Sequence, residues 1–285
     1  MTNRILITAD HCINDDFGSK GIGSTGGKYS LDYDNDGFAD WTANLTHFSR
    51  SGVAFGKSRL NSEESASDIA FLALDRELPY WAQIYTMGAY KAEQNIPGLG
   101  FRSTTTVDVV GYGQQGVANS NAKNNWEVGG VGLDRWVGFN NVTNDEVDFG
   151  GASVLNITLD DLTPLTICSP GGECTTYFES IGAFGDSGSG LFQKQWHFET
   201  NSSGMLTPIE EYVMIGVLST GSAEDVDPGA GKVQYTEYGD YSTYAGLGKH
   251  WISDALWDFE EVLGFDYWQD IVYLASLVCT DTVFT

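Results

Sequence analysis

Short apolar and β-branched runs, separated by turns rich in Gly, Asn, Asp and Ser, are the dominant pattern along this chain. Runs of this length with alternating or fully apolar character predict β-strands, because successive strand residues face opposite sides of a sheet. The strands predicted in this way cover residues 4–8, 52–55, 69–74, 107–110, 153–159 and 212–218. Many short strands of this kind predict an all-β fold, either a barrel or a sandwich.

One late stretch, residues 250–263, has a helical pattern instead. Its apolar side chains recur at helical spacing and fall near one face, which predicts a single helix after the strands. The residues on that face are Trp251, Ile252, Leu256 and Phe259. Aromatic and apolar residues continue beyond the helix, from Phe265 onward, as a tail to which the sequence assigns no role.

A polar, glycine-rich stretch at residues 89–106 divides the chain and is a candidate linker around Gly98 and Gly100. We therefore expect two subdomains, residues 1–105 and 106–264, followed by the tail at residues 265–285. A chain of 285 residues with 41% hydrophobic residues is long enough to bury a sizeable core in each subdomain.

The charge balance limits the kinds of partner that the protein could bind. Fourteen basic and 39 acidic residues give a net charge of −25, which repels nucleic acid and anionic membranes and favours cationic partners or divalent metals. No apolar stretch has the length of a membrane-spanning helix. The apolar run Ile5-Leu6-Ile7 is too short for the core of a signal peptide.

The sharpest chemical feature is the stretch Gly185-Asp186-Ser187-Gly188-Ser189-Gly190. Glycines around a serine allow a tight bend and a close approach of a substrate carbonyl to the main chain. The N–H groups of Gly185 and Ser187 are then able to point at one spot, as an oxyanion hole requires. Taken alone, a bare G-x-S-x-G pattern is more often a glycine-rich surface turn.

Two further stretches strengthen the chemical interpretation. His11 follows the apolar strand predicted at residues 4–8, and Asp68 immediately precedes the apolar strand predicted at residues 69–74. A carboxylate in such an apolar setting needs a partner, and a histidine is a suitable one. A structural core histidine is the alternative for His11. The remaining histidines lie in no comparable motif and are expected at the surface or in ordinary packing: His47, His197 and His250.

In the order His11, Asp68, Ser187, these stretches resemble the chymotrypsin-like (trypsin-fold) serine proteases, which carry T-A-A-H-C, D-I-A-L-L and G-D-S-G-G-P at the corresponding places. Weaker similarities extend the resemblance to about Leu256; they begin at Val110, Gly216, Tyr241 and Trp251. The resemblance implies two six-stranded antiparallel Greek-key barrels and a late C-terminal helix, with the first barrel incomplete at its N-terminus. It also implies a bacterial-type secreted protein.

The resemblance implies a catalytic role for each matching residue. Ser187 is expected to be the nucleophile, His11 the general base and then the general acid, and Asp68 the group that orients His11. Gly185 and Ser187 are expected to donate the oxyanion N–H groups.

It also implies how substrates bind. Ser219 and Gly221 are expected to pair with the substrate backbone as an added strand. Ile181, six residues before the nucleophile, falls at the base of the specificity pocket and is not an acid, so a preference for Lys or Arg is not expected. With Gly221 and Gly239 leaving the walls open, we expect a neutral pocket for an apolar or aromatic side chain.

The same resemblance raises a question about the strand at residues 4–8. The family has two strands before it, so we expect this strand to be an open edge and the chain to be a fragment or to begin at an internal methionine. Cys12 is then expected to lack its partner, while Cys168 pairs with Cys174 across a shortened loop. Asp186 is expected to lack the ammonium group that activation cleavage supplies in the family.

An acidic stretch after the histidine segment has the spacing of a calcium loop. Asp32, Asp34, Asp36 and Asp40, with Gly at the sixth position, match the start of an EF-hand-type loop. The twelfth position is Ala43, so the bidentate Glu is missing and a complete EF-hand is excluded. A partial calcium site and a solvated acidic turn are nearly balanced, and the calcium sites of trypsin-like proteases in this region favour calcium.

These observations predict a secreted serine endopeptidase, a monomer that acts on polypeptides through an acyl-enzyme. No cofactor is expected for catalysis, and the one bound ion that the sequence suggests is structural calcium. Two alternatives stay open. One is a catalytically inactive protease-like module for binding or adhesion, and the other is an acidic calcium-binding structural domain.

Overall fold

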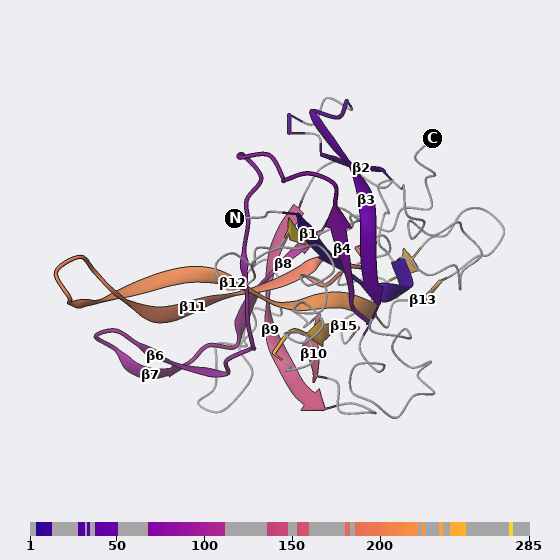
Figure 1. Cartoon of the computed structure of the whole chain (residues 1–285). Helices are drawn as coiled ribbons and strands as arrows, with labels where there is room; N and C mark the ends of the chain where they lie inside the picture. Colours follow the sequence, from indigo (N-terminus) through magenta and orange to yellow (C-terminus); the bar gives the residue numbers. More distant parts are fainter. Residues whose placement is uncertain are drawn as a thin grey trace.

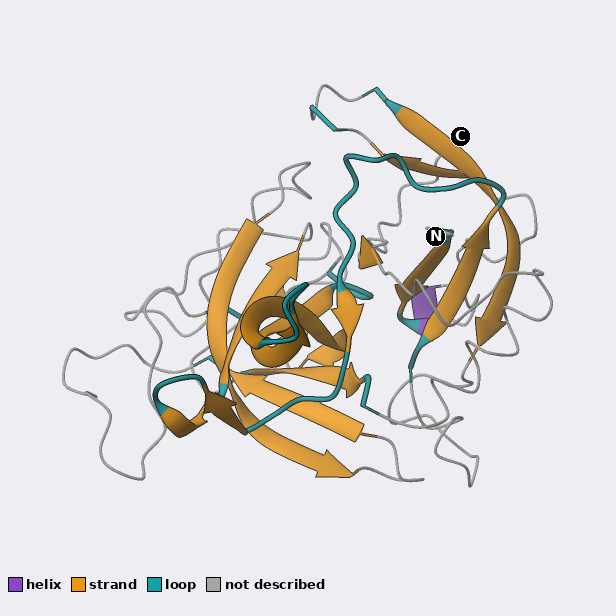
Figure 2. Cartoon of the chain, turned by 60° about the vertical axis from the view of Figure 1, so that its left-hand side comes forward, coloured by secondary structure: helices purple, strands orange, loops and turns teal. Residues whose placement is uncertain are grey.

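Nearly every regular element of the described chain is a β-strand (Figure 1). The structure is a computed structural model, and it describes residues 4–12, 28–31, 33–34, 38–50, 68–111, 136–147, 153–159, 180–182, 186–221, 224–225, 234–235, 240–248 and 274–275. In Figure 2 the described strands are joined by loops, and the exception is one 3₁₀ turn, η1, at Asp10–Cys12. An all-β fold is confirmed for this part of the chain.

The first sheet is curled and has the strand order β16-β1-β4-β3-β2. Its central strand β4 is apolar at every position and buried on both faces, as expected of a strand covered from two sides. The strands of this sheet are β1 (Ile5–Thr8), β2 (Lys28–Leu31), β3 (Trp41–Arg50), β4 (Ala70–Leu74) and β16 (Leu274–Ala275).

Strand β1 has a neighbour on each side. It pairs antiparallel with β4, and parallel with β16 through Leu6↔Leu274 and Ile7↔Ala275. The expectation of an open edge at this strand is therefore wrong. Every residue of β1 is buried, and a second neighbour also satisfies the backbone groups that an edge would leave to solvent.

The second sheet closes into a six-stranded barrel. Its order is β11-β8-β9-β10-β15-β12, and β11 pairs again with β12 to complete the ring, while the short β5 adds parallel to β12. The strands are β5 (Thr86–Met87), β8 (Thr106–Gly111), β9 (Trp136–Val147), β10 (Ser153–Thr158), β11 (Gly190–Thr200), β12 (Leu206–Gly221) and β15 (Tyr241–Gly246). Two short strands, β13 (Glu224–Asp225) and β14 (Gln234–Tyr235), pair with each other and belong to neither of these sheets.

Most of the predicted strands are confirmed. Those predicted at residues 4–8, 69–74, 107–110, 153–159 and 212–218 correspond to β1, β4, β8, β10 and β12. The strand predicted at residues 52–55 and the helix predicted at residues 250–263 lie outside the described residues. So does most of the tail.

The glycine-rich stretch predicted as a linker contains a β-hairpin, β6 (Glu93–Ile96) and β7 (Gly100–Ser103). Gly98 and Gly100 have φ values of 79° and 71°, which residues with a side chain rarely adopt, so the turn depends on these glycines. Figure 1 shows this hairpin projecting on the same side of the molecule as the long β11–β12 hairpin.

Buried glutamines attach the small hairpin to β11. The Gln94 side-chain amide donates to the carbonyl of Lys194 (2.9 Å), and its oxygen accepts from the N–H of Trp196 (3.0 Å). The side chain thus bonds the main chain of β11 in the way that a neighbouring strand would. Gln193 exchanges two bonds with the main chain of Lys91, at 2.9 and 3.1 Å. Buried amides require such partners, and here they fix the position of the hairpin.

Apolar residues from both sheets meet in one cluster, which we call the inter-sheet cluster. It consists of Ile5, Ile7, Ala9, Cys12, Ile69, Phe71, Ala73, Phe192, Met214, Val217, Ala245 and Leu247. A second cluster fills the barrel and a third covers the other face of the first sheet. The inter-sheet cluster holds the two sheets together, because burial of apolar area is the main favourable term in folding.

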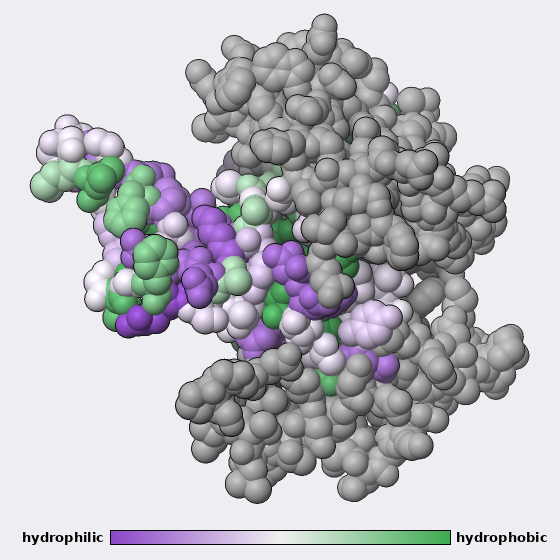
Figure 3. Space-filling view, turned by 90° about the horizontal axis from the view of Figure 1, so that it is seen from below, coloured by the Kyte–Doolittle hydropathy of each residue, from purple (hydrophilic) through white to green (hydrophobic). Residues whose placement is uncertain are grey.

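Apolar side chains are exposed among polar ones toward the far ends of the projecting hairpins (Figure 3). The exposed large side chains there are Leu99, Phe101, Phe198, Met205 and Leu206. No helix in the described part of the chain is long and apolar enough to cross a membrane.

The inter-sheet cluster predicts unequal effects of two methionine substitutions. Met214 is fully buried in the cluster, so Met214→Ala should lower the free energy of unfolding by about 2–5 kcal/mol. Met205 is 64% exposed, so Met205→Ala should change it by no more than about 0.5 kcal/mol. Urea denaturation of both variants measures the difference, and equal effects would contradict the assignment of the cluster.

Candidate active site

Strand β1 leads into the turn that carries His11. All residues of β1 are buried, and the N–H of Cys12 donates to the carbonyl of Ala9 (3.1 Å), which closes η1. Ala9 and Cys12 belong to the inter-sheet cluster. The main chain of His11 is therefore held where the two sheets meet, whereas its side chain lies outside the described residues.

Asp68 lies at the head of β4, next to Ile69 of the inter-sheet cluster, and is completely buried. The hydroxyl of Ser219 donates a hydrogen bond of 2.7 Å to Oδ2 of Asp68. Bonds of this kind to an ionised carboxylate are among the stronger hydrogen bonds in proteins. The sequence assigned Ser219 to substrate binding and gave no indication of this bond between residues 151 positions apart.

The serine turn is fixed onto β12. Within it, the N–H of Ser189 donates to the carbonyl of Asp186 (2.8 Å), and Gly188 has a φ of 85°. Gly188 donates to the carbonyl of Leu218 (2.9 Å), and Leu218 donates back to Ser189 (2.8 Å). Ser187, half-buried, is thus held beside the part of β12 that carries Ser219.

The three predicted catalytic segments converge. The sulfur of Cys12 lies 3.5 Å from the main-chain oxygen of Ser187, so the turn of His11 touches the serine turn. The serine turn is bonded to Leu218, and the adjacent Ser219 is bonded to Asp68. The distances within the triad and the oxyanion geometry stay predictions, because Gly185 and the His11 side chain lie outside the described residues.

Cys12 belongs to a disulfide bond. The expectation that it lacks a partner is therefore wrong. Each of the other cysteines, Cys168, Cys174 and Cys279, lies outside the described residues, and so does the predicted bridge between Cys168 and Cys174.

Asp186 is completely buried beneath the serine turn. A Cβ placed on Gly111 would collide with its Oδ1 and with the ring of Trp136, so the carboxyl group packs directly against this glycine. Burial, and then the charge of Asp186, raise the pKa of Tyr244 well above its ordinary value. Gly111 is therefore required for the close packing of this acid.

The predicted substrate residues occupy different environments. Gly221 is exposed and pairs with Ser242 on one side, and no described strand pairs with the other edge of β12 beyond Leu218. Ile181 is buried in the cluster that fills the barrel. Gly239 lies outside the described residues, so the shape of the pocket stays a prediction.

Of the predicted calcium loop, Asp34 and Asp40 are described and exposed, whereas Asp32 and Asp36 are not described. Oδ2 of Asp40 accepts a hydrogen bond of 2.7 Å from the N–H of Tyr33. Within the described ranges, no group of three or more acidic, His or Cys side chains has an arrangement that could hold a metal ion. Calcium binding therefore stays a prediction.

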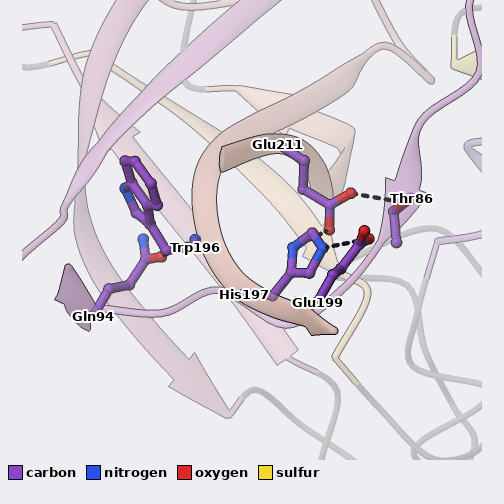
Figure 4. Close-up of polar contacts among 6 residues, drawn as sticks. All are labelled: Thr86, Gln94, Trp196, His197, Glu199 and Glu211. Carbon is purple, nitrogen blue, oxygen red and sulfur yellow. Dashed lines mark hydrogen bonds and ion pairs between the residues drawn. The ribbon is translucent and has the colours of Figure 1, made fainter. Parts of the chain in front are cut away.

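His197 lies between two glutamates on the long hairpin (Figure 4). Its Nε2 lies 3.0 Å from Glu199 and its Nδ1 lies 3.3 Å from Glu211, and Glu211 also accepts a bond of 3.3 Å from Thr86. The side chain of His197 is 35% exposed, so it is partly covered at the surface, and the expectation of a surface position or ordinary packing covers this environment. Neither the side chain of His47 nor any part of His250 is described.

A pocket of about 300 Å³, which the sequence did not indicate, opens on the barrel at the Gly246 end of β15. Its lining includes Tyr90, Asp145, Ser153, Leu155 and Ile215. Burial, and then the charge of Asp145, raise the pKa of Tyr90 to about 12. Because β12 and β15 run antiparallel with Gly216 opposite Gly246, this pocket is separate from the Ser219 end of β12.

Comparison of the sequence with models of known protein families gives no match, and comparison with curated proteins gives no significant match. The functional interpretation therefore depends on the motifs and on the geometry described above.

The Asp68 bond predicts a stability effect at Ser219. Ser219→Ala removes a donor from a buried carboxylate and should lower the free energy of unfolding by about 1.5–3 kcal/mol. The exposed Ser203→Ala is the matched control and should cost less than about 0.5 kcal/mol. Urea denaturation measures both, and an unchanged stability of Ser219→Ala would show that the bond contributes nothing.

The raised pKa of Tyr90 predicts a loss of stability at alkaline pH. The folded state keeps Tyr90 protonated up to about pH 12, whereas the unfolded chain ionises it near pH 10, so Tyr90 favours unfolding as the pH rises through this window. Tyr90→Phe should make the fall in stability between pH 10 and 12 shallower. Tyr80→Phe, at a site that is 99% exposed, should leave it unchanged. Denaturation at several pH values tests this, and identical slopes would contradict it.

Proposed function

We propose that the protein is a serine endopeptidase with a chymotrypsin-like, trypsin-type fold. The observation that carries this proposal is the hydrogen bond from Ser219 to Asp68, made beside the turn that holds Ser187. It connects the acid segment of the first sheet to the serine segment of the barrel. The contact between Cys12 and Ser187 brings the histidine segment to the same junction.

In the proposed reaction, Ser187 Oγ attacks the carbonyl carbon of a peptide bond while His11 accepts the hydroxyl proton. Asp68 orients His11 and stabilises the imidazolium that forms. The N–H groups of Gly185 and Ser187 stabilise the oxyanion. His11 then protonates the leaving amine, and water hydrolyses the acyl-enzyme by the same steps.

The proposed substrates are polypeptides whose backbone adds to the edge of β12 beyond Leu218, where no described strand pairs. A neutral pocket based on Ile181 favours an apolar or aromatic side chain over Lys or Arg. A buried disulfide at Cys12 supports an oxidising, extracytoplasmic location for the enzyme, which we propose acts as a monomer.

The principal alternative is an inactive protease-like module that binds without cutting. The buried Asp68 and its bonded Ser219 argue against this alternative, because a buried carboxylate is costly to keep where no histidine needs to be oriented. An acidic calcium-binding structural domain is a weaker alternative, since it depends on residues 32–40 alone.

A fluorophosphonate probe tests the proposal directly, because it reacts only with an activated serine. The unmodified protein should be labelled, Ser187→Ala should not, and Asp68→Asn should be labelled about 10⁴-fold more slowly. Ser203→Ala serves as a matched serine control and should be labelled at the normal rate. Circular dichroism establishes that each variant is folded. A folded full-length protein that resists labelling would favour the binding module.

A further inference from the structure

We propose that the pocket at the Gly246 end of β15 binds an organic amine, a ligand that carries a protonated amino group on an apolar body. This site is independent of the proposed function. Gly221, two residues beyond Ser219 on β12, pairs with Ser242 at the other end of β15. The pocket is therefore away from the segments of the proposed catalytic site.

The pocket exists because two adjacent strands have small residues at this end of the barrel. Residues two apart on a strand face the same side, so Ser153 shares the inner face of β10 with the buried Leu155. Gly246 likewise shares the inner face of β15 with the buried Tyr244. A Cβ on Gly246 would collide with the hydroxyl of Ser153. A cavity of about 300 Å³ remains here, at the lower end of the usual range for small-molecule sites.

The inner end of the pocket is apolar, and main-chain hydrogen bonds fix its walls. Leu155 and Ile215 border it and belong to the cluster that fills the barrel. The N–H of Leu247 donates to the carbonyl of Ile215 (2.9 Å), and the N–H of Gly88 donates to that of Met214 (3.0 Å). Both segments that flank β12 here are held on it, so the pocket is formed before a ligand binds.

Among the described lining residues, the charged side chain is that of Asp145. It lies opposite Leu155 in the register of β9 and β10, and cross-strand neighbours project from the same face of a sheet. Asp145 is exposed, so its carboxylate stands at the mouth of the pocket. A carboxylate accepts about four hydrogen bonds, so any bonds that Asp145 makes elsewhere leave its negative charge in place.

Tyr90 adds a hydroxyl and an aromatic ring beside this charge. Its ring packs against the cluster that fills the barrel. Burial, and then the charge of Asp145, raise the pKa of Tyr90 to about 12, so the phenol stays neutral near pH 7. A neutral phenol accepts a hydrogen bond from an ammonium group through its oxygen, and the face of its ring attracts a cation.

These groups favour an amine over other ligands. Asp145 and the net charge of −25 repel anions. A neutral apolar ligand would cover part of the carboxylate without giving it a partner. Calcium takes about six to eight oxygen ligands, whereas the described lining offers one carboxylate. An ammonium group pairs with the carboxylate and the phenol, while its apolar body covers the apolar inner end.

A free amine and a lysine side chain on a peptide present this same chemistry. Phenethylamine, protonated at neutral pH, represents the free amine, and N-acetyl-lysine N-methylamide represents lysine in a peptide. Binding of either compound in the way described below supports the site, and the tighter of the two identifies the source of the ligand.

Isothermal titration calorimetry of the full-length protein tests the site. Phenethylamine should bind about fivefold or more tightly than its neutral isostere phenethyl alcohol, a modest factor because water screens part of the Asp145 charge at the mouth. Asp145→Asn keeps the shape of the side chain and should abolish this preference. Glu93→Gln removes an exposed acidic charge from the small hairpin and should retain it, which controls for the general negative field.

Three results would overturn the proposal. They are an absence of binding by both amines, equal affinities of phenethylamine and phenethyl alcohol for the unmodified protein, and a preference for the amine that persists in Asp145→Asn, because the amine would then bind elsewhere. The comparison of the two isosteres needs no variant. No measurement uses Ser187, so the outcomes are distinct from success or failure of the probe labelling.

Discussion

The apolar contact between the first sheet and the six-stranded barrel determines where every proposed catalytic segment lies. Ala9 and Cys12 flank His11 in the chain, and Ile69 follows Asp68, and all three neighbours are buried in that contact. Close-packed interiors transmit small displacements instead of absorbing them. The position of the histidine turn relative to the acid and the serine is therefore set by side chains that take no part in the proposed chemistry. The proposed site lies where the two sheets meet, because its segments come from both of them.

Strand β12 connects this contact to the polar groups. Its buried middle supplies Met214 and Val217 to the inter-sheet cluster, and the next two residues bond the serine turn and Asp68. It is paired with β11 and β15, and also with β5. A strand supported on both sides has little freedom to shift, so the two hydrogen-bonding positions, Leu218 and Ser219, keep a fixed separation. Preorganisation of this kind is what a catalytic site needs from its scaffold.

The local pattern predicted the elements whose burial is visible in one stretch of sequence. β4 and β8 are continuous or alternating apolar runs, and both formed as predicted. The pattern failed where a structure depends on distant residues. β16 is only two residues long and pairs across most of the chain, Gln94 replaces strand pairing with a side chain, and Ser219 meets an acid far away in sequence. Periodicity carries no information about such partners. Motif order alone indicated that the segments of His11, Asp68 and Ser187 belong together.

The parallel pairing of β1 with β16 has a consequence for the order in which the chain folds. Ile7 meets Ala275, so the first sheet gains its final strand only after almost every other described element has been synthesised. Contacts of such long sequence separation form late, because closing a large loop costs entropy before any contact compensates for it. The barrel requires no partner from β16 and is able to form first, which shortens the effective loop. Until β16 pairs, the edge of β1 that it covers has no neighbour among the other described strands, and an unpaired apolar edge favours aggregation.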